Sequence, residues 1–202
     1  TTKIAMCRLG ERLGTVVLSV GGRHIQVYRD TGLVRHVTRS GEKILRHLGL
    51  NLKPGDYATL PSLRRVARVM ADLIVDALEC KSSPLARELM ETPPLPFVAS
   101  DDAVFISGGV ADFFYSDQEV KGIDDMAVFG DMGPLLGEEL RNHPCIRRWT
   151  VLKPPYTERA TVMGASRETV TLSGMTIWVG RREMLPLRNV PVIKPSLAPG
   201  FD

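Results

Sequence analysis

The sequence predicts an α/β fold, and three observations support this prediction. Runs of β-branched and apolar residues of strand length fill much of residues 1–40. Residues 62–79 repeat their apolar positions with the period of a helix. Further along, the apolar run Val104-Phe105-Ile106 stops at Gly108-Gly109, which is typical of a buried parallel strand that leads into a helix.

Four strands are expected before the first helix. The first two are predicted to form a hairpin around a turn at residues 10–13, and Gly21-Gly22 ends the second of them. The turn Asp30-Thr31-Gly32 separates the other two. The expected strands are residues 2–9, 14–20, 24–28 and 33–38.

Five helices are expected in the remainder of the chain. The surest is 62–79, because its apolar residues are spaced to form one buried face. These residues are Leu63, Val66, Ala67, Met70, Leu73, Ile74, Ala77 and Leu78. A proline-rich linker at 92–96 interrupts the helices. The expected helices are residues 42–48, 62–79, 84–90, 110–115 and 134–142.

The last third of the chain is harder to interpret. Asp131 precedes Gly133-Pro134 and is predicted to cap the helix at 134–142, with a magnesium contact as the alternative. Strands are expected at 146–152 and 172–179, and Trp149 and Trp178 on or beside them are expected to be core residues. Residues 160–170 fit either a helix or a strand, and the tail from 186 is expected to be irregular.

Composition excludes several classes of protein. The 26 basic and 23 acidic residues are mixed along the chain, so a nucleic-acid partner is not expected. Apolar runs have strand length, well short of the roughly 20 residues that span a bilayer, so we expect a soluble protein without a membrane partner. The three cysteines and four histidines are widely spaced, so neither a disulfide framework nor a metal site is expected.

The strand that ends at Gly108-Gly109 is the strongest candidate for a ligand site. Glycines at the carboxyl edge of a sheet leave backbone N–H groups open to an anion or a purine, although a plain turn explains such a pair as well. Neither this pair nor Gly21-Gly22 completes G-x-G-x-x-G, and no Walker lysine follows either one. The dinucleotide and P-loop folds are therefore excluded, which leaves folds that bind nucleotide with separate glycine turns.

Three segments resemble the actin, hexokinase and heat-shock chaperone superfamily. Residues 104–111, Val-Phe-Ile-Ser-Gly-Gly-Val-Ala, are similar to its adenosine motif, and residues 159–166 are similar to the small-residue segment that follows in the same lobe. Thr1-Thr2 resemble the end of its second phosphate motif, Asp-x-Gly-Gly-Gly-Thr. Because the chain starts at this point and without methionine, we expect it to be part of a longer protein.

Within that superfamily, the chain is most similar to the ethanolamine ammonia-lyase reactivating factors. The resemblance extends over almost the whole chain, through residues 18–23, 70–75, 106–110, 130–136, 159–164, 172–178 and 187–192. It implies the C-terminal lobe of an actin-like (ribonuclease H-like) ATPase, with a mixed sheet, flanking helices and a smaller inserted subdomain. The implied parts are hairpin strands at 1–40, a helical subdomain at 41–96, the adenosine-motif core at 97–185 and the tail at 186–202.

The resemblance also implies a function. Members are ATP-dependent, chaperone-like factors that exchange damaged cobalamin for adenosylcobalamin on ethanolamine ammonia-lyase, in the bacterial cytoplasm or the ethanolamine-utilisation microcompartment. The implied cofactors are ATP and Mg²⁺, the implied partners are the lyase and ATP/ADP, and a homo-oligomer is left open. ATPase activity is expected of the two-lobe protein and little of it from this chain alone. The alternatives are a non-catalytic interaction module with an actin-like fold and a lobe of a sugar or acetate kinase.

The resemblance gives a set of nucleotide-binding candidates but no catalytic side chain and no metal ligand. For Arg68 an ion pair with Asp72 is the alternative, for Glu158 a solvated carboxylate, and for the glycines a structural turn. The adjacent Arg64 and Arg65 are expected on a solvated helical face. The candidates are Gly108, Gly109, Val110, Glu158, Arg68, Gly21 and Gly22, with Thr1 and Thr2 as the phosphate-motif remnant.

Overall fold

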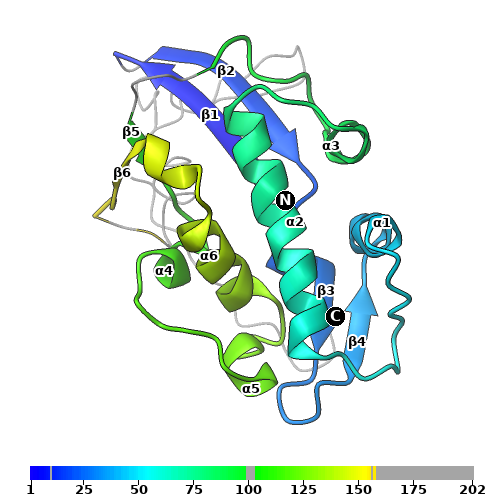
Figure 1. The fold of residues 1–202 in the computed structure, drawn as a ribbon. Coiled ribbons are helices and arrows are strands. Elements are labelled where there is room, and N and C mark those ends of the chain that lie inside the picture. The colour runs from blue at the N-terminus through cyan, green and yellow to red at the C-terminus, as the bar shows by residue number, and fades with distance from the viewer. Residues whose placement is uncertain (10, 99–102, 156, 158–202) are drawn as a thin grey trace, which may run out of the picture. The chain divides into compact units, whose positions relative to one another are not determined.

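The computed structural model describes residues 1–9, 11–98, 103–155 and 157 of the 202-residue chain. The chain divides into two compact units, Thr1–Glu158 and Arg159–Asp202, and all described residues lie in the first. This unit combines helices with small sheets, which confirms the predicted α/β class (Figure 1). The expectations for residues 158–202, among them Glu158, the segment 159–166 and Trp178, lie outside the described residues.

The first two strands form the predicted antiparallel hairpin. β1 (Thr2–Arg8) pairs with β2 (Glu11–Leu18), with Thr2 opposite Leu18 and Arg8 opposite Glu11. The register shifts between Met6 and Cys7, so that Leu13 is an extra residue in β2. The prediction of a turn over residues 10–13 is wrong, because the polar residues after Gly10 stay in the strand and face solvent at its tip.

The elements between β2 and α2 mostly follow the prediction. The short 3-10 helix η1 (Gly22–His24) leads into β3 (Ile25–Val27), which pairs antiparallel with β4 (Val34–Val37). Helix α1 (Arg39–His47) starts after Thr38, whose hydroxyl accepts a hydrogen bond from Gly41 N at 3.2 Å.

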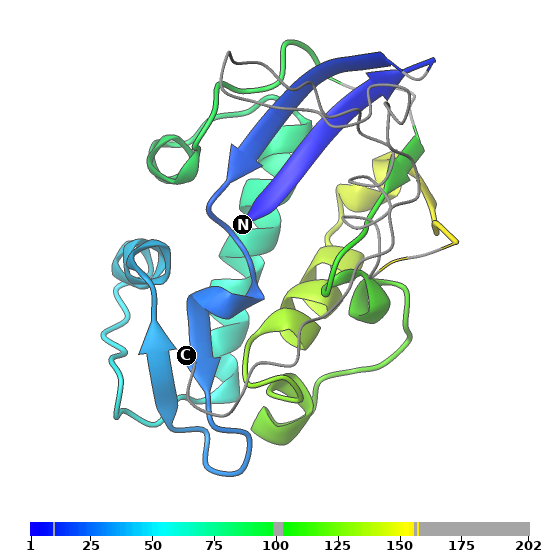
Figure 2. The ribbon, with the colours of Figure 1, turned by 180° about the vertical axis from the view of Figure 1, so that it is seen from behind.

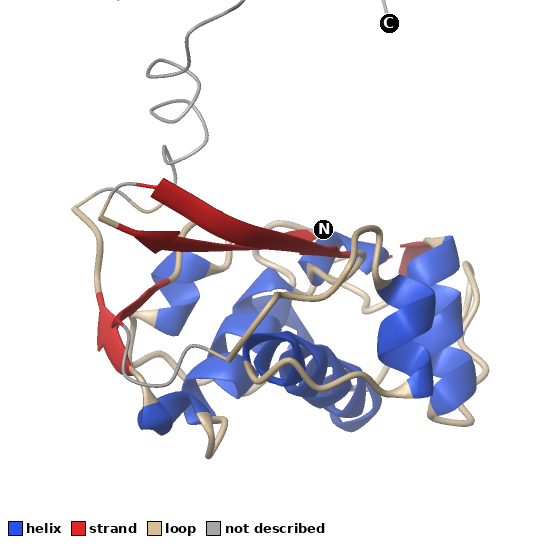
Figure 3. Cartoon of the chain, turned by 90° about the horizontal axis from the view of Figure 1, so that it is seen from above, coloured by secondary structure: helices blue, strands red, loops and turns tan. Residues whose placement is uncertain are grey.

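Helix α2 (Leu60–Leu78) is the longest element and supplies much of the core. All eight apolar residues on its predicted face are buried, which confirms that prediction. Helix α3 (Pro84–Leu89) follows, capped by Ser83, and the chain then returns along β2, where Met90 forms a bridge with Leu18. Figures 2 and 3 show the hairpin lying across one side of the helices, next to α2.

Strand β5 (Ala103–Phe105) pairs in parallel with β6 (Thr150–Leu152), in agreement with the parallel character predicted for the first of them, although its pairing with the second was not predicted. Burial of this strand is not observed, since Phe105 is 60% exposed and faces away from the described core. Among the described residues the strands form three separate two-stranded sheets rather than the one mixed sheet that was expected. The predicted strand at 146–152 is only partly correct, because it begins with the 3-10 turn η2 (Ile146–Arg148).

Three helices lie between β5 and β6 in sequence. They are α4 (Ala111–Phe114), α5 (Ile123–Met126), which was not predicted, and α6 (Gly133–Asn142). In Figure 1, α6 lies between α4 on one side and α2 on the other. Trp149 is buried near the end of α6, as predicted. No helix in the described part of the chain has the length and apolar character needed to cross a membrane.

Candidate functional site

The Gly108-Gly109 turn has the backbone geometry that requires glycine at one of its two positions. Gly108 has φ +95°, a value that side chains with a Cβ rarely adopt. A Cβ on either glycine would meet no described atom within 4 Å, so the surface above the turn is open. Gly108 N donates to Thr157 O at 2.8 Å, whereas Gly109 N has no hydrogen-bond partner among the described residues. The open donor of this turn is therefore Gly109 rather than Gly108.

Side chains that the sequence analysis missed hold this turn in place. The Tyr115 hydroxyl accepts from Ile106 N at 2.9 Å and donates to Leu152 O at 2.8 Å, so it ties the ends of β5 and β6 together. Burial raises the pKa of this phenol above its ordinary value, so it stays protonated and able to donate. The Thr157 hydroxyl bonds to the Asp112 carboxylate in the first turn of α4.

The second pair of glycines lies beside the start of the chain, as predicted. A Cβ on Gly21 would lie 3.1 Å from Thr1 N, and the Thr2 hydroxyl donates to Val20 O at 2.9 Å. Gly22 has a structural reason to be glycine, because its Cβ would lie 2.5 Å from Gly133 N. Thr1-Thr2 and the Gly21-Gly22 turn therefore lie side by side, and Gly22 packs on the start of α6.

Helix α6 contacts Gly22 and the segment that follows the Gly108-Gly109 turn. Gly22 packs against Gly133, and a Cβ on Gly137 would lie 3.0 Å from Val110 O and 2.7 Å from Phe113 Cβ. Residues 133 and 137 are one helical turn apart, so both lie on one face and are separated by about 6 Å along the axis. Gly22 and the segment after Gly108-Gly109 thus pack against adjacent positions of the same helix.

Asp131 was predicted to be the N-cap of α6, but it lies one residue before the N-cap position. The N-cap position belongs to Met132, and Asp131 Oδ1 accepts from Gly133 N at 2.7 Å. The carboxylate lies 3.8 Å from the exposed guanidinium of Arg23. Among the described residues, no group of three or more side chains is arranged to hold a metal ion.

Arg68, which belongs to α2, contacts a different face of α6 from the one that carries Gly133 and Gly137. Its Nε donates to Glu139 Oε2 at 2.9 Å, and Glu139 is two residues from Gly137, about 200° around the helix. The alternative, an ion pair with Asp72, is not observed, because Arg68 pairs with Glu139 and Asp72 bonds to His143 Nε2 at 3.0 Å. In this structure Arg68 is therefore not brought together with the glycine turns.

Arg64 is the centre of a largely buried ion-pair network and not part of a solvated face. Its Nη1 lies 3.1 Å from Glu138 Oε1 and 2.5 Å from Glu139 Oε1, and Nη2 donates to Val120 O at 2.8 Å. Burial lowers the pKa of the Arg64 guanidinium, but its bonds to Glu138 and Glu139 outweigh burial and raise that pKa. A cavity of about 360 Å³ adjoins this network between α2 and α6, lined by Arg64, Arg68, Asp72, Glu139 and His143 among others.

His24 lies beside the Gly21-Gly22 turn and is held neutral. Its Nδ1 lies 2.6 Å from the Thr38 hydroxyl at the start of α1, and its Nε2 is buried without a hydrogen-bond partner among the described residues. Burial lowers the pKa of His24 from 6.5 to about 4.

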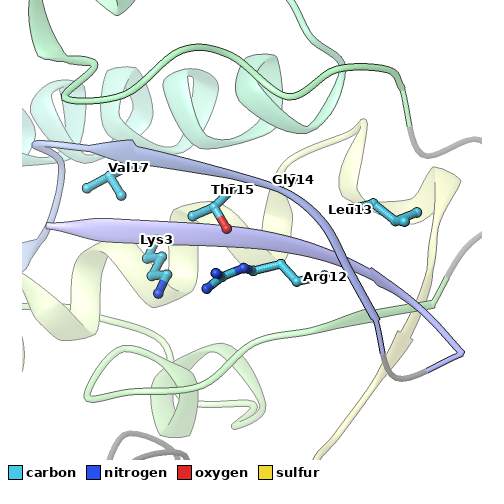
Figure 4. Close-up of a pocket in the computed structure, with 6 residues that line it drawn as sticks. All are labelled: Lys3, Arg12, Leu13, Gly14, Thr15 and Val17. Carbon is cyan, nitrogen blue, oxygen red and sulfur yellow. The ribbon is translucent and has the colours of Figure 1, made fainter. Parts of the chain in front are cut away.

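The outer face of the hairpin carries a second hollow, of about 490 Å³. Figure 4 shows Lys3 and Arg12 side by side on this face, together with Thr15 and Val17. None of the predicted nucleotide-binding residues lines the hollow, so we place the candidate site at the glycine turns on α6.

Comparison with known proteins identifies the family. Residues 1–199 match the family described as "Ethanolamine utilisation protein EutA". The chain belongs to the EutA family. This confirms the predicted resemblance to the ethanolamine ammonia-lyase reactivating factors.

Two curated relatives of this EutA-family chain carry the name "Ethanolamine ammonia-lyase reactivase EutA". The protein of Salmonella typhimurium strain LT2 is 38% identical over 196 residues, which cover 97% of this chain and 40% of the relative. The protein of Escherichia coli strain K12 is 37% identical over 195 residues, covering 96% of this chain and 40% of the relative. The chain thus spans about 40% of the length of these relatives, and no solved structure matches it.

The sequence pattern located the glycines of this EutA-family chain but not the residues that support them. Gly133 and Gly137 are spaced four residues apart in the predicted helix, which would have indicated a face for close backbone contact. No local pattern signals Tyr115 or Thr157, since each acts on a backbone group of a distant segment.

Proposed function

We propose that this chain is the nucleotide-binding lobe of an ATP-dependent reactivating factor for ethanolamine ammonia-lyase. Membership of the EutA family, and the names of relatives that are 37–38% identical, support the role in reactivation. The observation that carries the nucleotide part is that Gly22 and the backbone that directly follows Gly108-Gly109 pack on one face of α6, with Gly21 beside Thr1. Glycine turns leave backbone N–H groups open to a phosphate or a purine, as the resemblance to actin-like nucleotide sites implies.

We propose a role in nucleotide binding or in supporting the site for each of the predicted residues that the structure describes. The Gly109 amide is proposed as the donor to the adenosine side of the nucleotide, with Val110 at the start of α4 next to it. Gly108 supports the turn through its positive φ and its bond to Thr157. Thr1, Thr2 and Gly21 are proposed to border the phosphates. Gly22 is assigned a packing role against Gly133, and Arg68 an ion-pair role with Glu139.

The remaining parts of the proposal concern the whole protein. We propose that Mg²⁺ accompanies ATP, that ATP turnover opens and closes two lobes, and that this movement exchanges damaged cobalamin on the lyase. The proposed setting is the bacterial cytoplasm or the ethanolamine-utilisation microcompartment. We expect much of the hydrolytic machinery to come from other parts of the longer protein, so this chain alone should show little ATPase activity.

A set of glycine variants of the full-length protein tests the nucleotide site. Gly109→Val adds a side chain where the described structure has no atom within 4 Å, so the fold should be retained while the approach of a ligand is blocked. Gly108→Ala and Gly55→Ala are a matched pair. Both glycines have φ +95°, and a Cβ on either one would meet no described atom within 4 Å. Each also donates its N–H to a carbonyl, Gly108 to Thr157 O and Gly55 to Val34 O. Each should lose about 1–2 kcal/mol of stability for the same backbone reason.

Calorimetric titration with ATP and Mg²⁺ is the measurement. Gly109→Val should abolish the binding heat, Gly108→Ala should weaken binding, and Gly55→Ala should bind like the wild-type protein. Wild-type affinity in Gly109→Val would refute the site. An absence of binding heat in the wild-type protein would favour the alternative of a non-catalytic interaction module. Reactivation of inactivated lyase, followed with the same variants, tests the cellular role.

A further inference from the structure

Two arginines hold the segment that follows the Gly108-Gly109 turn. Arg141, in the last turn of α6, donates from Nη1 to Phe113 O at 3.1 Å and also to Ser116 O. Its Nη2 donates to Gln118 O at 2.9 Å. One side chain therefore binds three backbone carbonyls of residues 113–118, and no carboxylate partner of Arg141 is found among the described residues.

Helix α4 depends on such support because it has only four residues. Isolated helices of this length are not stable, and the last carbonyls of a helix have no partner within it. Arg141 supplies a donor to Phe113 O, and its positive charge lies at the helix end that attracts cations. The turn is continuous with α4, since Gly108 O accepts from Ala111 N at 2.9 Å and Val110 O from Phe114 N at 3.0 Å.

The position of Arg141 on α6 matches that of the two glycines. Residues 133, 137 and 141 are spaced by four, so they share one face of the helix. Gly133 receives Gly22, Gly137 receives the backbone of α4, and Arg141 binds the carbonyls at the end of α4. A single face of α6 therefore contacts Gly22 and the segment that follows Gly108-Gly109.

The second arginine ties the same segment to α2. Arg64 Nη2 donates to Val120 O at 2.8 Å, while Glu138 Oε2 accepts from Val120 N at 3.0 Å. Arg64 and Glu138 are themselves paired at 3.1 Å across α2 and α6. Both backbone groups of Val120 are thus fixed by a pair that belongs to two different helices.

We propose that Arg141 is a positioning residue for the Gly108–Gly109–Val110 turn, and that the Arg64–Glu138 pair links this turn to α2. A shift of α2 against α6 is then passed through Val120 and residues 113–118 to the turn, which regulates nucleotide binding there. The effect on nucleotide binding rests on the proposed function, whereas the structural coupling of α2 to the turn does not.

Hydrogen exchange of the full-length protein without nucleotide tests the link directly. Arg141→Gln and Arg64→Gln should each speed amide exchange in residues 109–118 by about tenfold or more. Arg141→Gln removes charge-assisted hydrogen bonds to residues 113–118, and Arg64→Gln removes one to Val120, two residues beyond. Arg65→Gln is the matched control, because Arg65 Nη2 donates to Leu48 O at 3.2 Å, away from this segment. Arg141→Lys should give an intermediate rate, because an ammonium cannot reproduce the guanidinium fork.

The affinity for ATP and Mg²⁺ separates positioning from simple structural support. At a temperature where all variants are folded, Arg141→Gln should raise the Kd about tenfold, Arg141→Lys should restore part of the affinity, and Arg65→Gln should bind normally. Unchanged exchange at 109–118 would overturn the proposal, and so would faster exchange with an unchanged Kd. If the wild-type protein does not bind ATP, the proposed function fails, and the exchange rates alone then decide the role of Arg141.

Discussion

Replacing Gly137 by alanine should displace α4 and destabilise the fold. The new Cβ would lie 2.7 Å from Phe113 Cβ and 3.0 Å from both Phe114 N and Val110 O. Two of these atoms are backbone and cannot rotate away, so we place the overpacking penalty near the upper end of about 1–3 kcal/mol. Alanine in mid-helix recovers about 1 kcal/mol relative to glycine. The expected net loss is about 1–2 kcal/mol of unfolding free energy.

Urea denaturation followed by circular dichroism measures this loss. Gly133→Ala is the matched control, since it adds the same methyl group one turn earlier in α6 and meets the carboxylate end of Asp131 at 2.9 Å, which can move. The control should lose less stability than Gly137→Ala. If Gly137→Ala were as stable as the wild-type chain or more so, helix propensity would dominate, and the close packing of α4 on α6 would be refuted.

Two further predictions concern charged groups. Lowering the pH from 6.5 to 4 should destabilise the fold, because the unfolded chain protonates His24 readily and the folded one, with its pKa lowered to about 4, does not. We expect a loss on the order of 1–2 kcal/mol, because the ring is partly exposed to solvent. Urea titrations at both pH values measure this loss of unfolding free energy. The loss should be smaller in His24→Gln than in the wild-type chain and the same as wild type in His36→Gln, where the histidine is exposed. An equal loss in the two variants would contradict the role of His24. Arg64→Met should lower the free energy of unfolding by about 2–4 kcal/mol, because it leaves the buried Glu138 and Glu139 carboxylates without their main partner. Arg68→Met should lower it by less than about 1 kcal/mol, because the Arg68 side chain is 65% exposed. Equal losses for the two variants in urea denaturation would argue against the network.

Much of the local structure could be predicted because it depends on neighbouring residues. The apolar repeat of α2 and the proline near its start fix that helix, and all eight predicted core residues are buried. The hairpin follows from its β-branched runs, and the glycine turn follows from the strand that ends there. Each of these features is set by the period or backbone preference of a short segment.

The rest could not be predicted because it depends on contacts between distant segments. Arg68 pairs with Glu139 rather than with Asp72, since α6 packs against α2, and no local spacing reveals this packing. Thr157 and Tyr115 reach the turn only after β5 and β6 have paired. The prediction of a buried strand at 104–106 was wrong for a similar reason. An apolar run indicates that burial would be favourable, but whether the strand is buried depends on distant segments that would have to cover it.

The position of Asp131 limits where an anion can approach the two glycine turns. A helix N-terminus attracts phosphate because its first amides are unpaired and its dipole is positive there. At α6, however, the Asp131 carboxylate already accepts from Gly133 N and brings a negative charge of its own. The Gly109 amide has no such partner among the described residues. Phosphates bordered by Thr1, Thr2 and Gly21 should therefore not bind to the first amide of α6, and the group that the nucleotide places beside Asp131 should be neutral or positively charged, as the proposed Mg²⁺ would be.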